Sequence, residues 1–340
     1  MARVQVAVIG YGFAGRCFHS YLVGLVPELE LRGICTANPE RQERARQERG
    51  CRIYATFDEV LADREVELVI LATPNASHCD LAVQALDAGK HVVADKVMCL
   101  NLAEYERMAA AAQRRGRLLT VFQNRRWDGD FLTLQQVMAD GVLGEVRWLE
   151  LAWQGFGAWG GWRGQKAAGG GKLYDLGAHL IDQVCLLFPE PTTSVYARLQ
   201  HDLPETDTES HALVVVNFAG GRTAVVDTSS LAAFAKPRFY ALGTKATFRK
   251  YGVDPQERKM IEGDIDAAVE APENYARIHD GKTETVCPTL PGRWRNYYEN
   301  IADVLRRGAK PLVTLESVRR QIAVLDAAFR SAAAGQAVSL

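Results

Sequence analysis

The feature that most constrains this chain is a glycine-rich turn placed directly after a short apolar run. Val4–Ile9 has the composition of a buried strand, and three glycines follow at once, at Gly10, Gly12 and Gly15. At this spacing they permit a tight turn, a close approach of a ligand to the backbone, and close packing of the next helix on the strand. A helix that opens near Ala14 adds unpaired N–H groups that favour an anion. The pattern predicts a strand, turn and helix that bind the pyrophosphate of a dinucleotide.

The first third of the sequence alternates apolar runs with helical segments. Thr56 with Glu59 and Asn101 with Glu104 have the spacing of helix N-terminal capping boxes, and Gly116 stands where helices end. A series of strands and helices of this kind builds a doubly wound parallel sheet. The predicted strands are Val4–Ile9, Leu29–Cys35, Leu68–Thr73, His91–Ala94 and Leu118–Phe122.

The pattern changes after residue 122, and longer alternating strands appear. Two hairpins are predicted, one turning through Ala219–Gly221 and one through Gly243 and Thr244. Helices are expected over Phe131–Ala139, Gly177–Phe188, Trp294–Arg307 and Glu316–Ala333. We therefore predict an α/β chain with a Rossmann domain at residues 1–122 and an α+β domain at residues 123–340 that carries a large, mainly antiparallel sheet. The last helices can pack back on the first domain.

Composition restricts the partners. The chain has 40 basic and 41 acidic side chains, and a net charge of −1 provides no field for holding nucleic acid. Its seven cysteines are scattered without a C-x-x-C pair, as in proteins of a reducing compartment. No apolar stretch reaches the roughly eighteen residues of a membrane span. We expect a cytoplasmic protein without membrane segment or metal site.

The end of the second strand bears on the choice of cofactor. NAD enzymes usually place an acidic residue there on the ribose hydroxyls, but this chain reads from Cys35 to Arg41 with no acid at the strand tip. Thr36 and Asn38 can donate hydrogen bonds to a 2′-phosphate, and Arg41 can add charge. These residues favour NADP, while Glu40 keeps NAD as the alternative.

Two segments carry groups suited to proton transfer. Lys96 ends a predicted parallel strand, at the edge where open α/β sheets bind ligands. Asp175 and His179 are four residues apart and share one helix face, and histidine exchanges protons near neutral pH. By itself an Asp-x-x-x-His pair is also compatible with a purely structural role.

Over nearly its whole length the chain resembles the glucose–fructose oxidoreductase/inositol dehydrogenase (Gfo/Idh/MocA) family, in particular the branch that includes NADP-dependent scyllo-inositol dehydrogenases. The shared motifs are the glycine turn, Thr73-Pro74-Asn75-x-x-His78, Gly89-Lys90-His91-Val92, the Lys96 motif, Gln123–Asp128, Leu173–Gly177 with His179, and Phe248–Gly252. The resemblance implies a nicotinamide-dependent sugar or polyol dehydrogenase with Lys96, Asp175 and His179 as its catalytic triad. His179 is then the acid/base, Lys96 polarises the reacting oxygen, and Asp175 orients the substrate hydroxyl.

The glycine turn, the strand tip and the resemblance together define two sets of binding residues. Those expected at the cofactor are Gly10, Gly12, Phe13, Ala14, Gly15, Thr36, Ala37, Asn38, Arg41, Thr73, Pro74, Asn75, His78, Asp95, Lys96, Asn124, Trp162 and Arg163. Those expected at the substrate are Lys96, Asn124, Arg126, Asp175 and His179.

One position departs from the family pattern of Glu-Lys-Pro, because this chain has Asp95-Lys96-Val97. Valine makes a cis peptide costly, by roughly 2.5–4 kcal/mol, so a different aim for the lysine is expected. The tryptophans at 148, 153, 159 and 162 fit sheet packing, an apolar floor under a sugar ring or a lid over the nicotinamide.

Three functions stay open at this point: an NADP-preferring sugar or polyol dehydrogenase, an NAD-dependent redox-assisted glycoside-cleaving enzyme, and a non-catalytic nucleotide-binding regulator. We also expect a homodimer or homotetramer that assembles through the open face of the second sheet. Val214, Val216, Val225 and His211 are its expected contacts.

Overall fold

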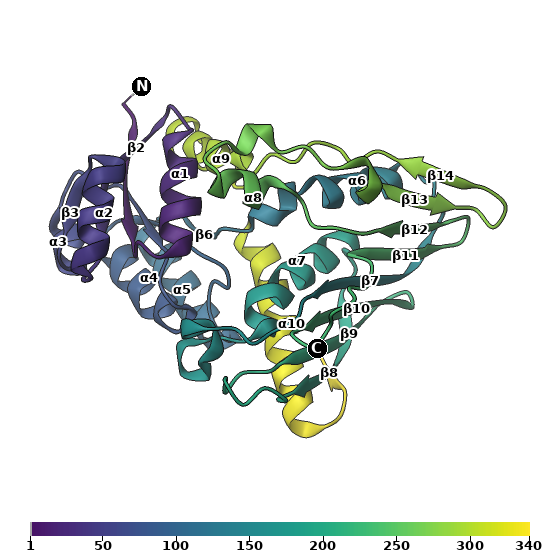
Figure 1. Ribbon diagram of the computed structural model, residues 1–340. Helices are drawn as coiled ribbons and strands as arrows, with labels where there is room; N and C mark the ends of the chain where they lie inside the picture. The colour runs from purple at the N-terminus through teal and green to yellow at the C-terminus, as the bar shows by residue number, and fades with distance from the viewer. Residues whose placement is uncertain (1) are drawn as a thin grey trace. The chain divides into compact units, whose positions relative to one another are not determined.

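The computed structural model describes residues 2–340, which divide into two compact units (Figure 1). Unit 1 runs to Gln123 and also includes Trp294–Val318. Unit 2 consists of Asn124–Arg293 and Arg319–Leu340. Unit 1 therefore incorporates a helix from late in the sequence, α9 (Arg295–Arg307), which packs on α1 and β1.

The core of unit 1 is a six-stranded parallel sheet in the order β3-β2-β1-β4-β5-β6, which confirms the predicted Rossmann sheet. The strands are β1 (Val4–Ile9), β2 (Leu29–Cys35), β3 (Arg52–Tyr54), β4 (Leu68–Leu71), β5 (His91–Ala94) and β6 (Leu119–Val121). Only β3 was not predicted. It has three residues, and its first, Arg52, is exposed, so no apolar run marks it.

Two helices of unit 1, α3 and α5, begin at the predicted caps. Thr56 accepts a hydrogen bond from the backbone N–H of Glu59 at 3.3 Å, and Asn101 accepts one from Glu104 at 2.9 Å. The returning carboxylates bond one residue earlier than a capping box requires, at Ala55 N and Leu100 N. The helices are α1 (Ser20–Gly24), preceded by a π-helical segment (Ala14–His19), α2 (Pro39–Arg49), α3 (Phe57–Ala62), α4 (His78–Asp87) and α5 (Leu102–Arg115).

Unit 2 is built on a nine-stranded sheet in the order β14-β13-β12-β11-β7-β10-β9-β8-β15 (Figure 1). Every neighbouring pair is antiparallel except β7 and β10. Both predicted hairpins are confirmed, β9 with β10 and β11 with β12. The strands are β7 (Val146–Gln154), β8 (Thr192–Gln200), β9 (His211–Phe218), β10 (Arg222–Ser229), β11 (Phe239–Gly243), β12 (Thr247–Lys250), β13 (Ala276–His279), β14 (Glu284–Cys287) and β15 (Val338–Ser339).

Helices of unit 2 cover one face of this sheet, and burial along the strands alternates accordingly. The helices of this part of the chain are α6 (Gly129–Ala139), α7 (Ala178–Leu187), α8 (Gln256–Ile261) and α10 (Leu315–Ala334), and α7 packs on β7 and β10. Val214 and Val216 are fully buried on the covered face, whereas His211 and Val225 are half-buried. The prediction that Val214 and Val216 offer contacts on the open face is therefore wrong, because a strand places alternate side chains on opposite faces.

Across residues 2–340 no helix is both long and apolar enough to cross a membrane.

Candidate functional site

The predicted cofactor residues of unit 1 lie at one edge of its sheet. Strands β2, β1, β4 and β5 are adjacent and parallel, so the loops that follow them meet at their carboxyl ends. The loop after β1 carries the glycine turn, and the loop after β2 carries Thr36 to Arg41. The loops after β4 and β5 carry Thr73 to His78 and Asp95 to Lys96.

The glycine turn is built so tightly that side chains cannot replace two of its glycines. Gly10 has a φ of +95°, and a Cβ on it would lie 2.4 Å from the carbonyl oxygen of Ala72. A Cβ on Gly15 would lie 2.0 Å from the carbonyl oxygen of Gly10. At Gly12 the nearest atom to such a Cβ is Nη1 of Arg41, 3.8 Å away, so the backbone is open there. The turn fits a dinucleotide pyrophosphate.

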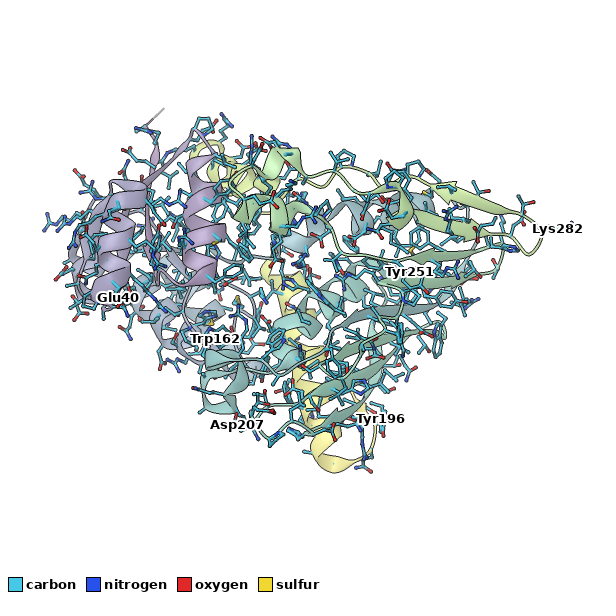
Figure 2. All side chains as sticks on the ribbon, in the orientation of Figure 1. Glu40, Trp162, Tyr196, Asp207, Tyr251 and Lys282 are labelled. Carbon is cyan, nitrogen blue, oxygen red and sulfur yellow. The ribbon has the colours of Figure 1, made fainter. Side chains whose placement is uncertain are left out.

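The tip of β2 brings a positive charge beside the turn. Asn38 caps α2, with its Oδ1 accepting the backbone N–H of Arg41 at 2.9 Å. Thr36 is buried, while Ala37 and Arg41 are exposed. Because Nη1 of Arg41 lies near Gly12, its positive charge is beside the glycine turn. Glu40 is exposed on α2 (Figure 2).

The loop after β4 is braced by a buried histidine. His78 is fully buried, and its Nε2 and Nδ1 lie 2.9 Å from the carbonyl oxygens of Thr73 and Val97. The ring therefore connects the loop after β4 to the loop after β5. Asn75 is buried and Pro74 is exposed in the same loop.

Asp95, before the predicted catalytic lysine, is held by a network that sequence reasoning missed. Its Oδ1 accepts the backbone N–H of Lys96 at 2.8 Å and lies 3.6 Å from Nε2 of His19. Nδ1 of His19 lies 2.6 Å from the hydroxyl of Tyr298. Burial raises the pKa of Asp95, but His19 and Lys96 outweigh burial and lower it to about 2. The Lys96–Val97 peptide is cis, contrary to the expectation from valine.

In unit 2, Asp175 and His179 lie at the entrance of α7. Asp175 belongs to a π-helical turn (Leu173–Gly177) that runs directly into α7, and both side chains are buried. Nε of Arg163 lies 3.3 Å from Oδ2 of Asp175, and the guanidinium packs 4.8 Å from the centre of the Trp162 ring. The structure thus brings three of the residues predicted from the sequence, Asp175, Arg163 and Trp162, into one cluster.

Trp153, on β7, supports the predicted acid/base residue. Its ring stacks on His179, with centroids 6.1 Å apart and an interplanar angle of 29°. The guanidinium groups of Arg125 and Arg238 lie 4.3 and 4.6 Å from the Trp153 centroid. Two cations on an aromatic ring fix its position, so Trp153 holds the imidazole plane. From the sequence, Trp153 was one of four tryptophans with the same possible roles, and nothing in the sequence distinguished it.

Arg126, predicted at the substrate, is committed to another partner. Its Nε and Nη2 donate to the carboxylate of Asp182 at 2.8 and 2.6 Å, and both side chains are buried. Asp182 follows His179 by one helical turn on α7. Arg126 therefore neutralises Asp182 and anchors the helix that carries His179. Asn124 is buried in the preceding turn.

Taken chemically, unit 1 offers an anion-binding turn with a cation beside it, and unit 2 offers a buried carboxylate and imidazole. Within residues 2–340, no three His, Cys, Asp or Glu side chains gather as ligands for a metal ion. The groups of unit 1 suit a bound dinucleotide, and those of unit 2 suit proton transfer.

Comparison with known proteins agrees with this arrangement. Residues 4–123 match the model of the oxidoreductase family with an NAD-binding Rossmann fold, and residues 131–249 match that of the GFO/IDH/MocA C-terminal domain. The chain is 31% identical to scyllo-inositol 2-dehydrogenase (NADP(+)) IolW of Bacillus subtilis, over 96% of this chain and 93% of that protein. It is 25% identical to D-apiose dehydrogenase of Paraburkholderia graminis, over 99% and 90%. The solved structure of the Bacillus subtilis oxidoreductase yvaA superposes with a TM-score of 0.92 at 30% identity, covering 100% of this chain and 99% of that one.

Proposed function

The chain belongs to the Gfo/Idh/MocA family of NAD(P)-binding oxidoreductases, and on that premise we propose that it is an NADP-preferring dehydrogenase of a sugar or polyol such as an inositol. The observation that carries the proposal is the buried pair at the entrance of α7, Asp175 with His179, held by Arg163 and Trp153. A buried carboxylate and imidazole on one helix suit the removal of a proton from an alcohol. The chain's similarity to the scyllo-inositol and D-apiose dehydrogenases supports this class of substrate.

The preference for NADP rests on the tip of β2. No carboxylate follows Cys35 before Glu40, and the Arg41 guanidinium lies beside the open backbone of Gly12. A guanidinium recognises phosphate oxygens well, and the missing acid removes repulsion against a 2′-phosphate. The glycine turn would hold the pyrophosphate.

In this proposal each catalytic side chain has a separate role. When bound, NADP accepts or donates the hydride. His179 exchanges the hydroxyl proton; because its Nδ1 is buried, we assign the exchange to Nε2. Asp175 accepts a hydrogen bond from a substrate hydroxyl. Lys96, on a backbone fixed by Asp95, donates to the reacting oxygen.

The test is a panel of sugars, inositols and their keto forms with NADP and NAD, followed at the nicotinamide absorbance. We expect turnover of at least one polyol with NADP preferred. His179→Ala should reduce kcat by about 100-fold or more while NADPH still binds, since general acid/base groups contribute about that much. An unchanged rate in this variant would remove His179 from the reaction.

The same panel separates the two alternatives. Glycoside cleavage without added cofactor and without net NAD(P)H would identify a redox-assisted glycoside-cleaving enzyme. Tight NADPH binding with no turnover of any panel member would favour a nucleotide-binding regulator.

We also propose self-association, as a dimer or tetramer, through the uncovered face of the unit 2 sheet. A hollow of about 360 Å³ lies on this sheet, and Val225, Tyr240 and Tyr251 contribute to its lining. Tyr251 is exposed (Figure 2). Light scattering of wild type and Tyr240→Glu measures the assembly, and a wild-type monomer would contradict it.

A further inference from the structure

A second set of charged groups lies in unit 2, in a small cavity whose lysine and glutamate, Lys172 and Glu209, have no part in the proposed mechanism. The cavity lies between the loop that carries Trp162 and the loop that carries Asp207, both labelled in Figure 2. The two loops are joined by a hydrogen bond of 2.6 Å from the backbone N–H of Lys166 to Asp207. The cavity is lined by Trp159, Arg163, Lys172, Leu203, Thr206, Thr208, Glu209, Ser210 and Ser230.

Lys172 is the unusual member of this set. The residue is 5% exposed, and its Nζ lies 3.8 Å from the centre of the Trp159 ring. Within the described residues no carboxylate oxygen lies within 4.0 Å of this Nζ. An ammonium group in such a place retains hydrogen-bond donors for a further partner, because a ring face satisfies its charge only in part.

Glu209 lines the same cavity and supplies a negatively charged hydrogen-bond acceptor. Its Oε1 accepts the backbone N–H of Leu173 at 2.6 Å. The carboxylate lies so close to Gly171 that a Cβ there would be 2.6 Å from both of its oxygens. Gly171 has a φ of +114°, so the backbone before Lys172 is shaped around this carboxylate. The second carboxylate oxygen can accept from a ligand.

Burial changes the pKa of both Lys172 and Glu209. Burial lowers the pKa of Lys172 to about 8, although Asp175 and Glu209 oppose the shift. Burial also raises the pKa of Glu209, against the hydrogen bond from Leu173. Both groups are thereby brought closer to neutrality than when exposed, as is common where side chains bind a ligand.

The cavity is connected to the proposed reaction site through Arg163. This side chain lines the cavity, and its Nε is 3.3 Å from Oδ2 of Asp175. Lys172 precedes Asp175 by three residues, at the start of the same π-helical turn. A substrate bound at Asp175 therefore lies next to Arg163, a side chain that also lines this cavity.

We propose that the Lys172–Glu209 cavity is a subsite for a single hydroxyl group of the substrate, one that is not the reacting hydroxyl. The ammonium of Lys172 donates a hydrogen bond to the hydroxyl oxygen, and the carboxylate of Glu209 accepts a hydrogen bond from the hydroxyl group. The inference rests on the proposed function, because it concerns a polyhydroxylated substrate at Asp175.

Two features favour a hydroxyl over an acidic group. A carboxylate or phosphate on the ligand would meet the negative charge of Glu209, whereas a hydroxyl pairs with donor and acceptor together. The cavity also has room for only a water-sized group. Three further polar residues, Thr206, Thr208 and Ser210, also line the cavity.

The experiment couples a change in the protein to a change in the ligand. D-glucose, D-xylose and myo-inositol, each with its mono-deoxy analogues, are titrated against NADPH-saturated protein by tryptophan fluorescence. In wild type we expect one deoxy position to weaken binding by about 10- to 100-fold, the value of a hydrogen bond to a charged group. In Lys172→Met and Glu209→Gln the same removal should weaken binding less than about 3-fold.

The control is Lys166→Met, which removes an exposed side chain from the loop that carries Trp162, leaves the backbone bond to Asp207 in place and should keep the wild-type pattern. Circular dichroism melts establish that each variant is folded, and Glu209→Gln preserves the volume and the contact with Leu173 if Lys172→Met is unstable. Equal deoxy penalties in wild type and variants, or no binding by any of these polyols, would overturn the subsite.

These outcomes are distinct from failure of the proposed function. Turnover of a panel alcohol with unchanged deoxy penalties would remove the subsite and leave the dehydrogenase. A deoxy penalty that depends on Lys172 and Glu209, without hydride transfer to any panel alcohol, would retain the subsite and remove the dehydrogenase. A cavity filled by water alone would show no deoxy position that depends on Lys172, and this result also counts against the subsite.

Discussion

Arg126 and Asp182 form a buried ion pair in which the guanidinium donates two hydrogen bonds, 2.8 and 2.6 Å long, to the carboxylate. Asp182 lies one turn beyond His179 on α7, so the pair ties the proposed acid/base helix to the turn before α6. The planar guanidinium of Arg126 binds both carboxylate oxygens at once, and the single ammonium group of a lysine at this position would not reproduce this bidentate geometry.

Loss of one partner of this pair should be costly. Arg126→Met leaves the Asp182 carboxylate buried without its cation, and we expect the free energy of unfolding to fall by about 3–5 kcal/mol in urea denaturation. The double variant Arg126→Met/Asp182→Leu should recover most of the loss, since two apolar side chains replace two charges. The control is Arg330→Met, which breaks a more exposed pair with Asp326 and should cost less than about 1 kcal/mol. Equal losses in both single variants would contradict the role of burial.

The glycine turn makes a sharp prediction about cofactor binding. Gly15→Ala places a Cβ 2.0 Å from the Gly10 carbonyl oxygen, so the backbone must shift and the anion cradle opens. We expect NADPH affinity, measured by nucleotide fluorescence, to fall at least about 10-fold. Gly24→Ala is the matched control, because nothing lies within 4 Å of its Cβ position. Retained affinity in Gly15→Ala would place the nucleotide elsewhere.

The choice between cofactors should depend on Arg41. Arg41→Ala removes the cation beside Gly12, and we expect the Kd of NADPH to rise about 10-fold while that of NADH stays nearly constant. Arg44→Ala removes an exposed arginine from the same helix and should change neither constant by more than about 2-fold. A wild type that binds NADH more tightly than NADPH would overturn the proposed preference.

The depressed pKa of Asp95 predicts a dependence of stability on pH. Its folded-state pKa of about 2 lies below the value of ~3.9 for an unfolded chain. The carboxylate therefore contributes stability above the unfolded-state pKa, and this stability is lost as the pH falls toward about 2. We expect Asp95→Asn to lose about 2 kcal/mol of unfolding free energy at neutral pH and less near pH 3.

Urea denaturation of wild type and Asp95→Asn at both pH values measures this difference. Glu40→Gln, on the exposed surface of α2, serves as the control and should match wild type within about 0.5 kcal/mol. A gap between Asp95→Asn and wild type that grows on acidification would show that the carboxylate is not stabilised by His19.

Local patterns were sufficient for most of the secondary structure. The ends of β1, β2 and β5 are those predicted, because apolar runs and turn residues are properties of neighbouring positions in the chain. The glycine turn likewise follows from spacing alone. Short or polar elements such as β3 carry no such signal, and only their neighbours in the sheet make them strands.

What the sequence by itself determined is thus most strands of the first unit, two hairpins and the long helices of the rest, the family and the residues that carry its motifs. Only the tertiary structure decided which face of β9 is covered, and that placed Val214 and Val216 inside. It also decided the partners of buried charges, such as Arg126 with Asp182 and His19 with Asp95 and Tyr298. The physical reason is that a period of two defines two faces without saying which is buried, and a buried charge selects its partner by distance in space, as His19 and Tyr298 do across 279 positions.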